Sequence, residues 1–250
     1  MALYQIKIAY DGTHFFGFQR QGDARTVQLE IENVLRQFKW TGKSILCAGR
    51  TDTGVHASGQ VITFELDWQH DLETLLKALN AKMPEDIAVN AVRVADDGFH
   101  PRYNAISRCY HYRIYCQPNR NPLRDRFAWR VWPPVFFEPM QQAAKSLLGT
   151  HDFSAFGAPT QKGGHTIRTI MEAEWSQVQT DEFLFSVRAN AFLYHMVRRL
   201  VYLQVKIGQG LWDLEKFEQG VETQFLQLPG LAKPNGLILV EVKYQTPGSN

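Results

Sequence analysis

The chain has 250 residues, of which 44% are hydrophobic and 21% charged, and its formal net charge at pH 7 is +2. This balance is typical of a soluble globular protein, and no apolar run approaches the roughly 18–20 residues that a membrane-spanning helix needs. The three cysteines form neither a CxxC pair nor an even disulfide framework, and the N-terminus reads directly as structure, without a signal segment. We therefore expect a reducing compartment, the cytoplasm.

The first half of the chain predicts the element order β-α-β-β-α-β. In the opening segment Ile6, Ile8 and Tyr10 alternate with polar residues, which indicates a strand. Apolar residues then recur at helical spacing after Thr26, whose hydroxyl can cap the first turn. The elements predicted in this half are strands over 3–10, 44–49, 60–66 and 87–94 and helices over 27–38 and 72–83.

The second half repeats this order. Tyr110, Tyr112 and Ile114 share one face of a predicted strand, and a long amphipathic helix is predicted to begin near Phe192 and end at Gly208. A shorter helix follows it. The other elements predicted here are strands over 107–116, 166–175, 183–189 and 237–244 and a helix over 138–148.

Each half thus reads as a split βαβ, ferredoxin-like unit, which predicts an α+β fold. We place the halves at residues 1–104 and 105–250 and expect them to be related by a pseudo-two-fold axis. Two such sheets side by side would leave a central cleft, where ligands are commonly bound.

The charges are unevenly distributed along the chain. Residues 98–130 hold seven arginines, one acid and seven aromatic residues, and residues 183–212 hold no acid. Guanidinium groups grip phosphates and aromatic rings stack on exposed bases, so this mixture favours RNA as a partner. The alternative is a solvated basic face beside an aromatic core.

Several chemistries have no motif in this sequence. It contains no glycine-rich Walker sequence and no GxGxxG after a strand, so nucleotide cofactor binding has no support. The eight histidines form no HExxH and no Cys/His pattern with zinc spacing, and no G-x-S-x-G elbow occurs. We therefore expect neither a cofactor nor a metal.

The best candidate for a reactive centre is the loop around Asp52. Gly49 and Gly54 would keep this loop open to a bulky ligand, and Arg50 puts a cation within reach of a phosphate. A carboxylate beside an arginine is ionised at neutral pH and could serve as a nucleophile or a base. The alternative for an aspartate in a loop is a turn residue that bonds nearby backbone amides.

In these residues the chain resembles the tRNA pseudouridine synthase A (TruA) family, nearly from end to end. The segment 49–61 resembles the family's catalytic loop and is the most specific of six matches that occur in the family's order. The matching segments are YDGTHFFGFQRQ (10–21), GRTDTGVHASGQV (49–61), SRCYHYRIY (107–115), LLGTHDFSAF (147–156), NAFLYHMVRRLV (190–201) and GLILVEV (236–242).

The resemblance implies a role for four residues. Asp52 corresponds to the essential aspartate, and Tyr110 to the tyrosine that lies against the target base. Arg50 corresponds to a loop arginine that helps to displace the nucleotide and hold the RNA. Arg198 corresponds to the basic residue that pairs with the aspartate. Without the resemblance, Tyr110 would be read as a core aromatic residue and Arg198 as a solvated helix residue.

Other residues near these motifs are given smaller roles. Arg199 is the weaker choice because adjacent helix positions point about 100° apart. His56 and Gln60 are expected only to shape the loop. The sequence departs from the family at Tyr202, where a glycine is frequent, and at Ile238, where an aromatic residue is frequent. Both departures concern local packing.

The resemblance implies an isomerase that converts uridine to pseudouridine at positions 38, 39 and 40 of the tRNA anticodon arm, without cofactor or metal, as a homodimer. It leaves open which positions and tRNAs are served, and whether Asp52 attacks C1′, adds to C6 or acts through a glycal. The alternatives are an RNA-binding module without catalysis, another enzyme on the same scaffold and a glycosidase-like hydrolase. The last would need a second carboxylate, and Glu65 and Asp67 lie beyond the following strand.

Overall fold

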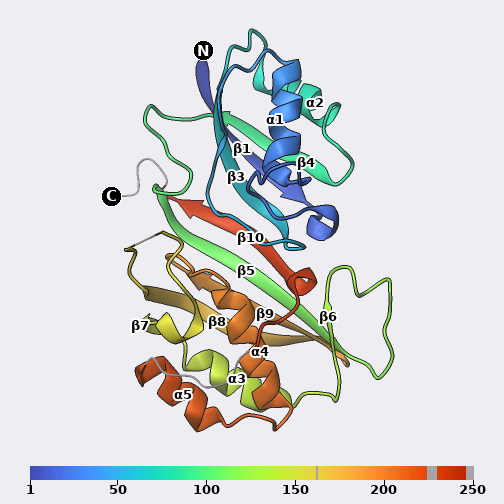
Figure 1. The fold of residues 1–250 in the computed structure, drawn as a ribbon, viewed down its shortest axis with the longest axis vertical. Coiled ribbons are helices and arrows are strands. Elements are labelled where there is room, and N and C mark those ends of the chain that lie inside the picture. The colour runs from blue at the N-terminus through green and yellow to red at the C-terminus, as the bar shows by residue number, and fades with distance from the viewer. Residues whose placement is uncertain (162, 224–229, 246–250) are drawn as a thin grey trace. The chain divides into compact units, whose positions relative to one another are not determined.

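A computed structural model describes residues 1–161, 163–223 and 230–245. The chain divides into two compact units (Figure 1). The first contains Met1–Ile106 together with the closing segment from Ile238, and the second contains Ser107–Leu237. The sequence prediction put the closing strand in the second half, whereas the structure groups it with the first unit.

The first unit has the predicted ferredoxin-like order of elements. Strand β1 lies between β4 and β3 and is antiparallel to both, with Ile6 opposite Ile62 and Val92. Two further strands pair with β3, β2 in an antiparallel and β10 in a parallel arrangement. The elements are β1 (Ala2–Tyr10), α1 (Val27–Gln37), β2 (Leu46–Cys47), β3 (His56–Leu66), α2 (Leu72–Asn80), β4 (Ile87–Val94) and β10 (Leu237–Tyr244).

The core of the first unit follows the predicted alternation. Ile6 and Ile8 of β1 are fully buried, while Lys7 between them is exposed. Helix α1 buries Ile31 and Leu35 at helical spacing. As predicted, the Thr26 side chain caps α1, accepting a hydrogen bond from the backbone N–H of Leu29 at 3.4 Å.

The second unit is again a sheet with helices. Its strands follow the order β5-β9-β8-β7, all antiparallel, and the short β6 pairs with β5 in parallel. On β5, Tyr112 and Ile114 are fully buried, as their shared face predicted. The elements are β5 (Ala105–Cys116), β6 (Trp129–Val131), α3 (Phe137–Lys145), β7 (Gly149–Asp152), β8 (Ile167–Gln179), β9 (Glu182–Ala189), α4 (Met196–Gly208) and α5 (Leu214–Thr223).

Both units are thus α+β, which confirms the predicted fold class, while the two-fold relation and the cleft between the halves stay predictions. Several boundaries differ from the prediction, and that of α4 has a clear local cause. Helix α4 begins at Met196, not near Phe192, because His195 has a left-handed backbone with φ 64°. Just before it, the N–H of Tyr194 bonds to the carbonyl of Ala158. The segment before α4 is therefore used for pairing and not for helix.

Candidate active site

Asp52 lies in the loop between β2 and β3, at the start of a tight turn. The N–H of Val55 donates to the carbonyl of Asp52 at 3.1 Å, and Gly54 has φ +76° at the third position of this turn. A glycine is favoured there because side chains rarely adopt positive φ. The Asp52 residue is half-buried, and Arg50 is exposed. The turn thus presents a carboxylate and a guanidinium on the same loop.

The loop before this turn is fixed by hydrogen bonds from three other parts of the chain. The hydroxyl groups of Thr51 and Tyr10 are 2.7 Å apart, which ties the loop to the end of β1. The carbonyl of Thr51 accepts the N–H of Phe18 at 3.0 Å. From β3, the side-chain amide of Gln60 donates to the carbonyl of Gly49 at 2.6 Å. Asp52 therefore follows a backbone with little freedom to move.

The segment 10–21 packs directly against this loop. Gly12 donates its N–H to Nδ1 of His56 at 3.0 Å, and a side chain at Gly12 would overlap the carbonyl oxygen of Val55. Gly17 has φ +83°, and a Cβ there would lie 2.9 Å from the carbonyl oxygen of Thr51. The segment that resembled the family's opening motif is therefore the support of the Asp52 loop. His56 and Gln60 make contacts that support the loop.

Cys47 marks the near edge of the loop. Burial raises the pKa of its thiol to about 11, although the guanidinium groups of Arg50 and Arg102 act in the opposite direction. The thiol is therefore protonated at neutral pH and is a poor nucleophile. The same electrostatics place two guanidinium groups close enough to Cys47 to influence it.

Tyr110 lies on β5 in the second unit, opposite Val187 of β9. Its ring packs edge-to-face against Phe192, with the ring centroids 5.1 Å apart. Tyr112 on the same face is fully buried, whereas Tyr110 is half-buried. Part of the Tyr110 side chain is thus accessible to a ligand.

Arg198 and Arg199 of α4 point to different parts of the second unit. Nε of Arg198 donates to the carbonyl of Ala232 at 2.8 Å, and the N–H of Ala232 donates back to the carbonyl of Arg198 at 3.2 Å. Arg199 instead reaches the carbonyl of Ala155, at 3.4 Å. Burial raises the pKa of Tyr112 far above its usual range, while Arg198 lowers it, so the Arg198 guanidinium lies near that phenol.

The predicted site residues therefore fall into two pairs. Asp52 and Arg50 share one loop in the first unit, and Tyr110 and Arg198 belong to the second unit.

Sequence reasoning missed a buried carboxylate that supports the site. Glu32 of α1 is fully buried and accepts hydrogen bonds from Arg20 at 2.6 Å, from Gln28 at 2.8 Å and from the N–H of Ile45 at 3.2 Å. Arg20 belongs to the segment 10–21, so Glu32 ties that segment to α1. The available signal was the spacing of Gln28 and Glu32, which puts two polar residues on one face of the helix.

Comparison with known proteins identifies the family. A family model described as tRNA pseudouridine synthase matches residues 6–104 and 143–245. The chain belongs to the tRNA pseudouridine synthase family. Members of this family are isomerases that act on uridine in tRNA. The chain is 42% identical over 248 residues to proteins called tRNA pseudouridine synthase A from Streptococcus pneumoniae strain 70585 and from serotype 4, strain ATCC BAA-334 / TIGR4. In both cases the match covers 98% of this chain and 100% of the relative.

A likeness among solved structures is too weak to support any conclusion about this synthase. It is to a chain of a crystal structure of a Cbf5-Nop10-Gar1 complex, with a TM-score of 0.33 and 11% sequence identity. The likeness covers 80% of this chain and 54% of the other.

The departure of this synthase from the family pattern at Tyr202 is accommodated locally. The Tyr202 ring stacks on Trp129, with centroids 6.4 Å apart and planes 13° apart. A side chain at Gly230 would overlap this ring, so the glycine makes room for it. At the other departure, Ile238 of β10 is paired with His56 of β3. Both differences are packing features of this synthase.

Within residues 1–161, 163–223 and 230–245, no group of three His, Cys, Asp or Glu side chains is arranged to hold a metal ion. Across the same residues, no helix has the length and apolarity to cross a membrane.

Proposed function

We propose that this chain converts uridine to pseudouridine at positions 38, 39 and 40 in the anticodon stem-loop of tRNA, with Asp52 as the catalytic carboxylate. The observation that carries the proposal is the braced turn that presents a half-buried Asp52 beside an exposed Arg50. A carboxylate held in this way is positioned before the substrate arrives, and so little ordering is left for the reaction itself.

The reaction balances without any co-reactant. The bond between N1 and C1′ breaks, the uracil turns within the site, and C5 forms a new bond to C1′ while the proton on C5 leaves and N1 gains one. Nothing is oxidised and no group is donated from outside, so the chemistry requires neither a cofactor nor a metal. The carboxylate of Asp52 attacks C1′, adds to C6 or removes the 2′ proton, and each of these steps uses its ionised form.

The remaining site residues bind the displaced nucleotide. A stacked uridine is out of reach, so the base must be flipped out at a cost of a few kcal/mol. Stacking on the ring of Tyr110 offsets about 1–3 kcal/mol of that cost. Arg50 holds a phosphate next to the Asp52 turn, and Arg198 supplies a cation for the Asp52 carboxylate.

The decisive experiment is tritium release from tRNA containing [5-³H]uridine, because forming the new bond at C5 expels the label. We expect release with the wild-type protein and none with Asp52→Ala, while both bind an anticodon stem-loop with similar affinity. Equal release by the two proteins would remove Asp52 from its role. A change at His14, an exposed residue of the segment 10–21, serves as the control, and His14→Gln should release tritium at the wild-type rate.

The second candidate is an RNA-binding module without catalysis, favoured only by the arginine and aromatic residues of 98–130. In that case the wild-type protein would bind the stem-loop and release no tritium. Membership of an isomerase family supports catalysis instead.

We further propose that the protein works as a homodimer in the cytoplasm. Support comes from the family resemblance and from the size of a tRNA relative to a single chain of 28.7 kDa. Light scattering at working concentration should give twice that mass, and a mass of one chain would count against the dimer.

A further inference from the structure

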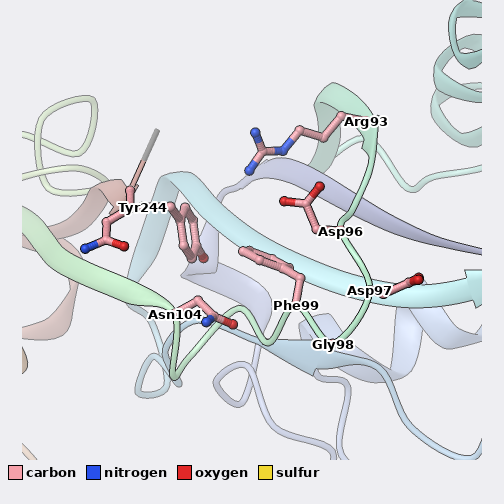
Figure 2. A pocket seen from close by; sticks show the side chains of 8 residues that line it. Arg93, Asp96, Asp97, Gly98, Phe99, Asn104 and Tyr244 are labelled. Atoms are coloured by element: carbon pink, nitrogen blue, oxygen red, sulfur yellow. The ribbon is translucent and has the colours of Figure 1, made fainter. Parts of the chain in front are cut away.

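The segment between β4 and β5 is held in place at its start. The rings of Phe99 and Tyr244 pack with centroids 5.0 Å apart, and the Tyr244 hydroxyl donates to the carbonyl of Pro101 at 2.8 Å. Figure 2 shows these two rings next to each other, with their planes 59° apart, and Asn104 nearby. We call residues 99–104 the anchored segment.

His100 fixes the rest of the anchored segment. Its backbone N–H donates to Oδ1 of Asn104 at 2.6 Å, and the N–H of Asn104 donates to the carbonyl of His100 at 3.0 Å. Nδ1 of the His100 ring accepts the N–H groups of Arg102 at 3.1 Å and of Tyr103 at 3.4 Å. The backbone beneath Arg102 and Tyr103 is therefore ordered in the free protein.

The anchored segment presents an aromatic platform and a cation. Tyr103 is 69% exposed, and its ring lies over that of His100 with centroids 4.3 Å apart and planes 37° apart. The guanidinium of Arg102 is 6.0 Å from the centre of the Tyr103 ring. The guanidinium groups of Arg102 and Arg50 both lower the pKa of the Cys47 thiol, so both groups lie near Cys47, at the edge of the Asp52 loop.

We propose that the anchored segment is a second nucleotide-binding subsite of the enzyme, in which Tyr103 stacks on an unpaired base next to the target uridine and Arg102 holds its phosphate together with Arg50. This inference rests on the proposed function, since the occupant is part of the same RNA. Exposed aromatic rings beside guanidinium groups are the common features of single-stranded RNA sites.

The charges around the anchored segment limit where the phosphate can lie. Next to it, and lined in part by its own Phe99, is a hollow of about 220 Å³ whose other lining residues include Arg93, Asp96, Asp97 and Tyr244 (Figure 2). Two exposed carboxylates make that hollow unsuitable for a phosphate. The phosphate is therefore held by Arg102 and Arg50 and not in the hollow.

The test is the dissociation constant of an anticodon stem-loop, measured by fluorescence anisotropy with variants of the anchored segment. Tyr103→Leu should weaken binding by about 5- to 150-fold, the value of one stacked base. Tyr103→Phe keeps the ring and should bind like the wild type. Arg102→Gln should reduce the slope of log K against log salt concentration by about 0.7–0.9, the contribution of one phosphate.

The control is Phe136→Leu, which removes an equally exposed aromatic ring (70% exposed) from the second unit and should leave binding unchanged. Wild-type affinity in Tyr103→Leu, or an equal loss in Phe136→Leu, would overturn the subsite. Binding is measured without turnover, so the two proposals can fail separately. If the wild-type protein releases tritium and Tyr103→Leu binds the stem-loop with wild-type affinity, the subsite alone is overturned. The expected binding pattern without any tritium release would overturn the proposed isomerisation alone.

Discussion

At the scale of single residues, the position of Asp52 depends on neighbours that carry no charge. Gly12 lies so close to the backbone of Val55 that no side chain fits between them, and Val55 closes the turn that Asp52 begins. Thr51, next to Asp52, is held by the hydroxyl of Tyr10. The position of the carboxylate is therefore set by contacts that the end of β1 and the residues after it make with the loop.

Gly12→Ala tests this dependence. The new methyl group would push Val55 and the Asp52 turn away, so we expect the free energy of unfolding to fall by about 1–3 kcal/mol. A displacement near 1 Å should lower kcat on the order of 100-fold. Chemical denaturation and tritium release under saturating tRNA measure the two effects.

Gly22→Ala is the matched control. Gly22 has φ +45° and nothing within 4 Å of a Cβ, so only the backbone strain of about 1–2 kcal/mol applies and kcat should not change. Equal kcat for the two alanine variants would mean that Gly12 does not position the site.

The same scale shows why the sequence predicted some site residues and not others. Asp52 and Arg50 could be predicted to lie together because they stand in one loop, where neighbours in sequence are neighbours in space. Glu32 was missed because its partners Arg20 and Ile45 are 12 and 13 residues away along the chain. A buried carboxylate in a helix looks like any other glutamate until its donors are known.

At the scale of elements, the anchored segment is held by the neutral form of His100. Its Nδ1 atom accepts two backbone N–H groups, which requires a lone pair on that nitrogen. Burial, with a smaller contribution from Arg102, lowers the pKa of His100 below its usual 6.5. The hydrogen bonds and the shift in pKa therefore favour the same protonation state.

This element should lose stability in weak acid. An unfolded His100 takes up its proton around pH 6.5, whereas the folded one takes it up at lower pH. Its contribution to the free energy of unfolding is thus fully present above pH 6.5 and declines as the pH falls toward the folded-state pKa. Thermal unfolding gives the Tm of each protein at pH 7 and at pH 5. The difference between these two Tm values should be smaller for His100→Gln than for the wild type, because glutamine can accept a hydrogen bond without titrating.

In His100→Gln the difference in Tm between pH 7 and pH 5 should become smaller without disappearing. The reason is that the pKa of His111 in the second unit is also lowered, by burial and by Arg113 and Arg188. An unchanged difference in Tm would show that His100 does not make this contribution.

Elements whose apolar residues recur at a regular spacing were predicted well, and elements whose ends depend on tertiary contacts were not. The helix after Thr26 and the strand at 87–94 were predicted to within a residue. The predicted strand at 44–49 is reduced to Leu46–Cys47, because only two residues pair with β3. Helix α4 starts late because His195 is left-handed, and the spacing of apolar residues carries no sign of that.

At the scale of the whole molecule, the chain leaves the first unit after Ile106 and returns to it at Ile238. The returning strand β10 pairs with the first residues of β3, immediately after the Asp52 turn, with Leu239 opposite Ala57. The C-terminal strand thus supports a loop that lies about 190 residues earlier in the sequence. A prediction from the sequence divides the chain at a single point and therefore assigns β10 to the second half.

Gly59→Ala tests whether β10 supports the site. A side chain at Gly59 would overlap the carbonyl oxygen of Val240, so β10 must move away from β3. We expect the free energy of unfolding to fall by about 1–3 kcal/mol, together with a loss of kcat, because the start of β3 loses its neighbour. Ser58→Ala, an exposed position on the same strand, should stay within about 0.5 kcal/mol of the wild type in chemical denaturation. Wild-type stability and kcat in Gly59→Ala would show that the site does not depend on the returning strand.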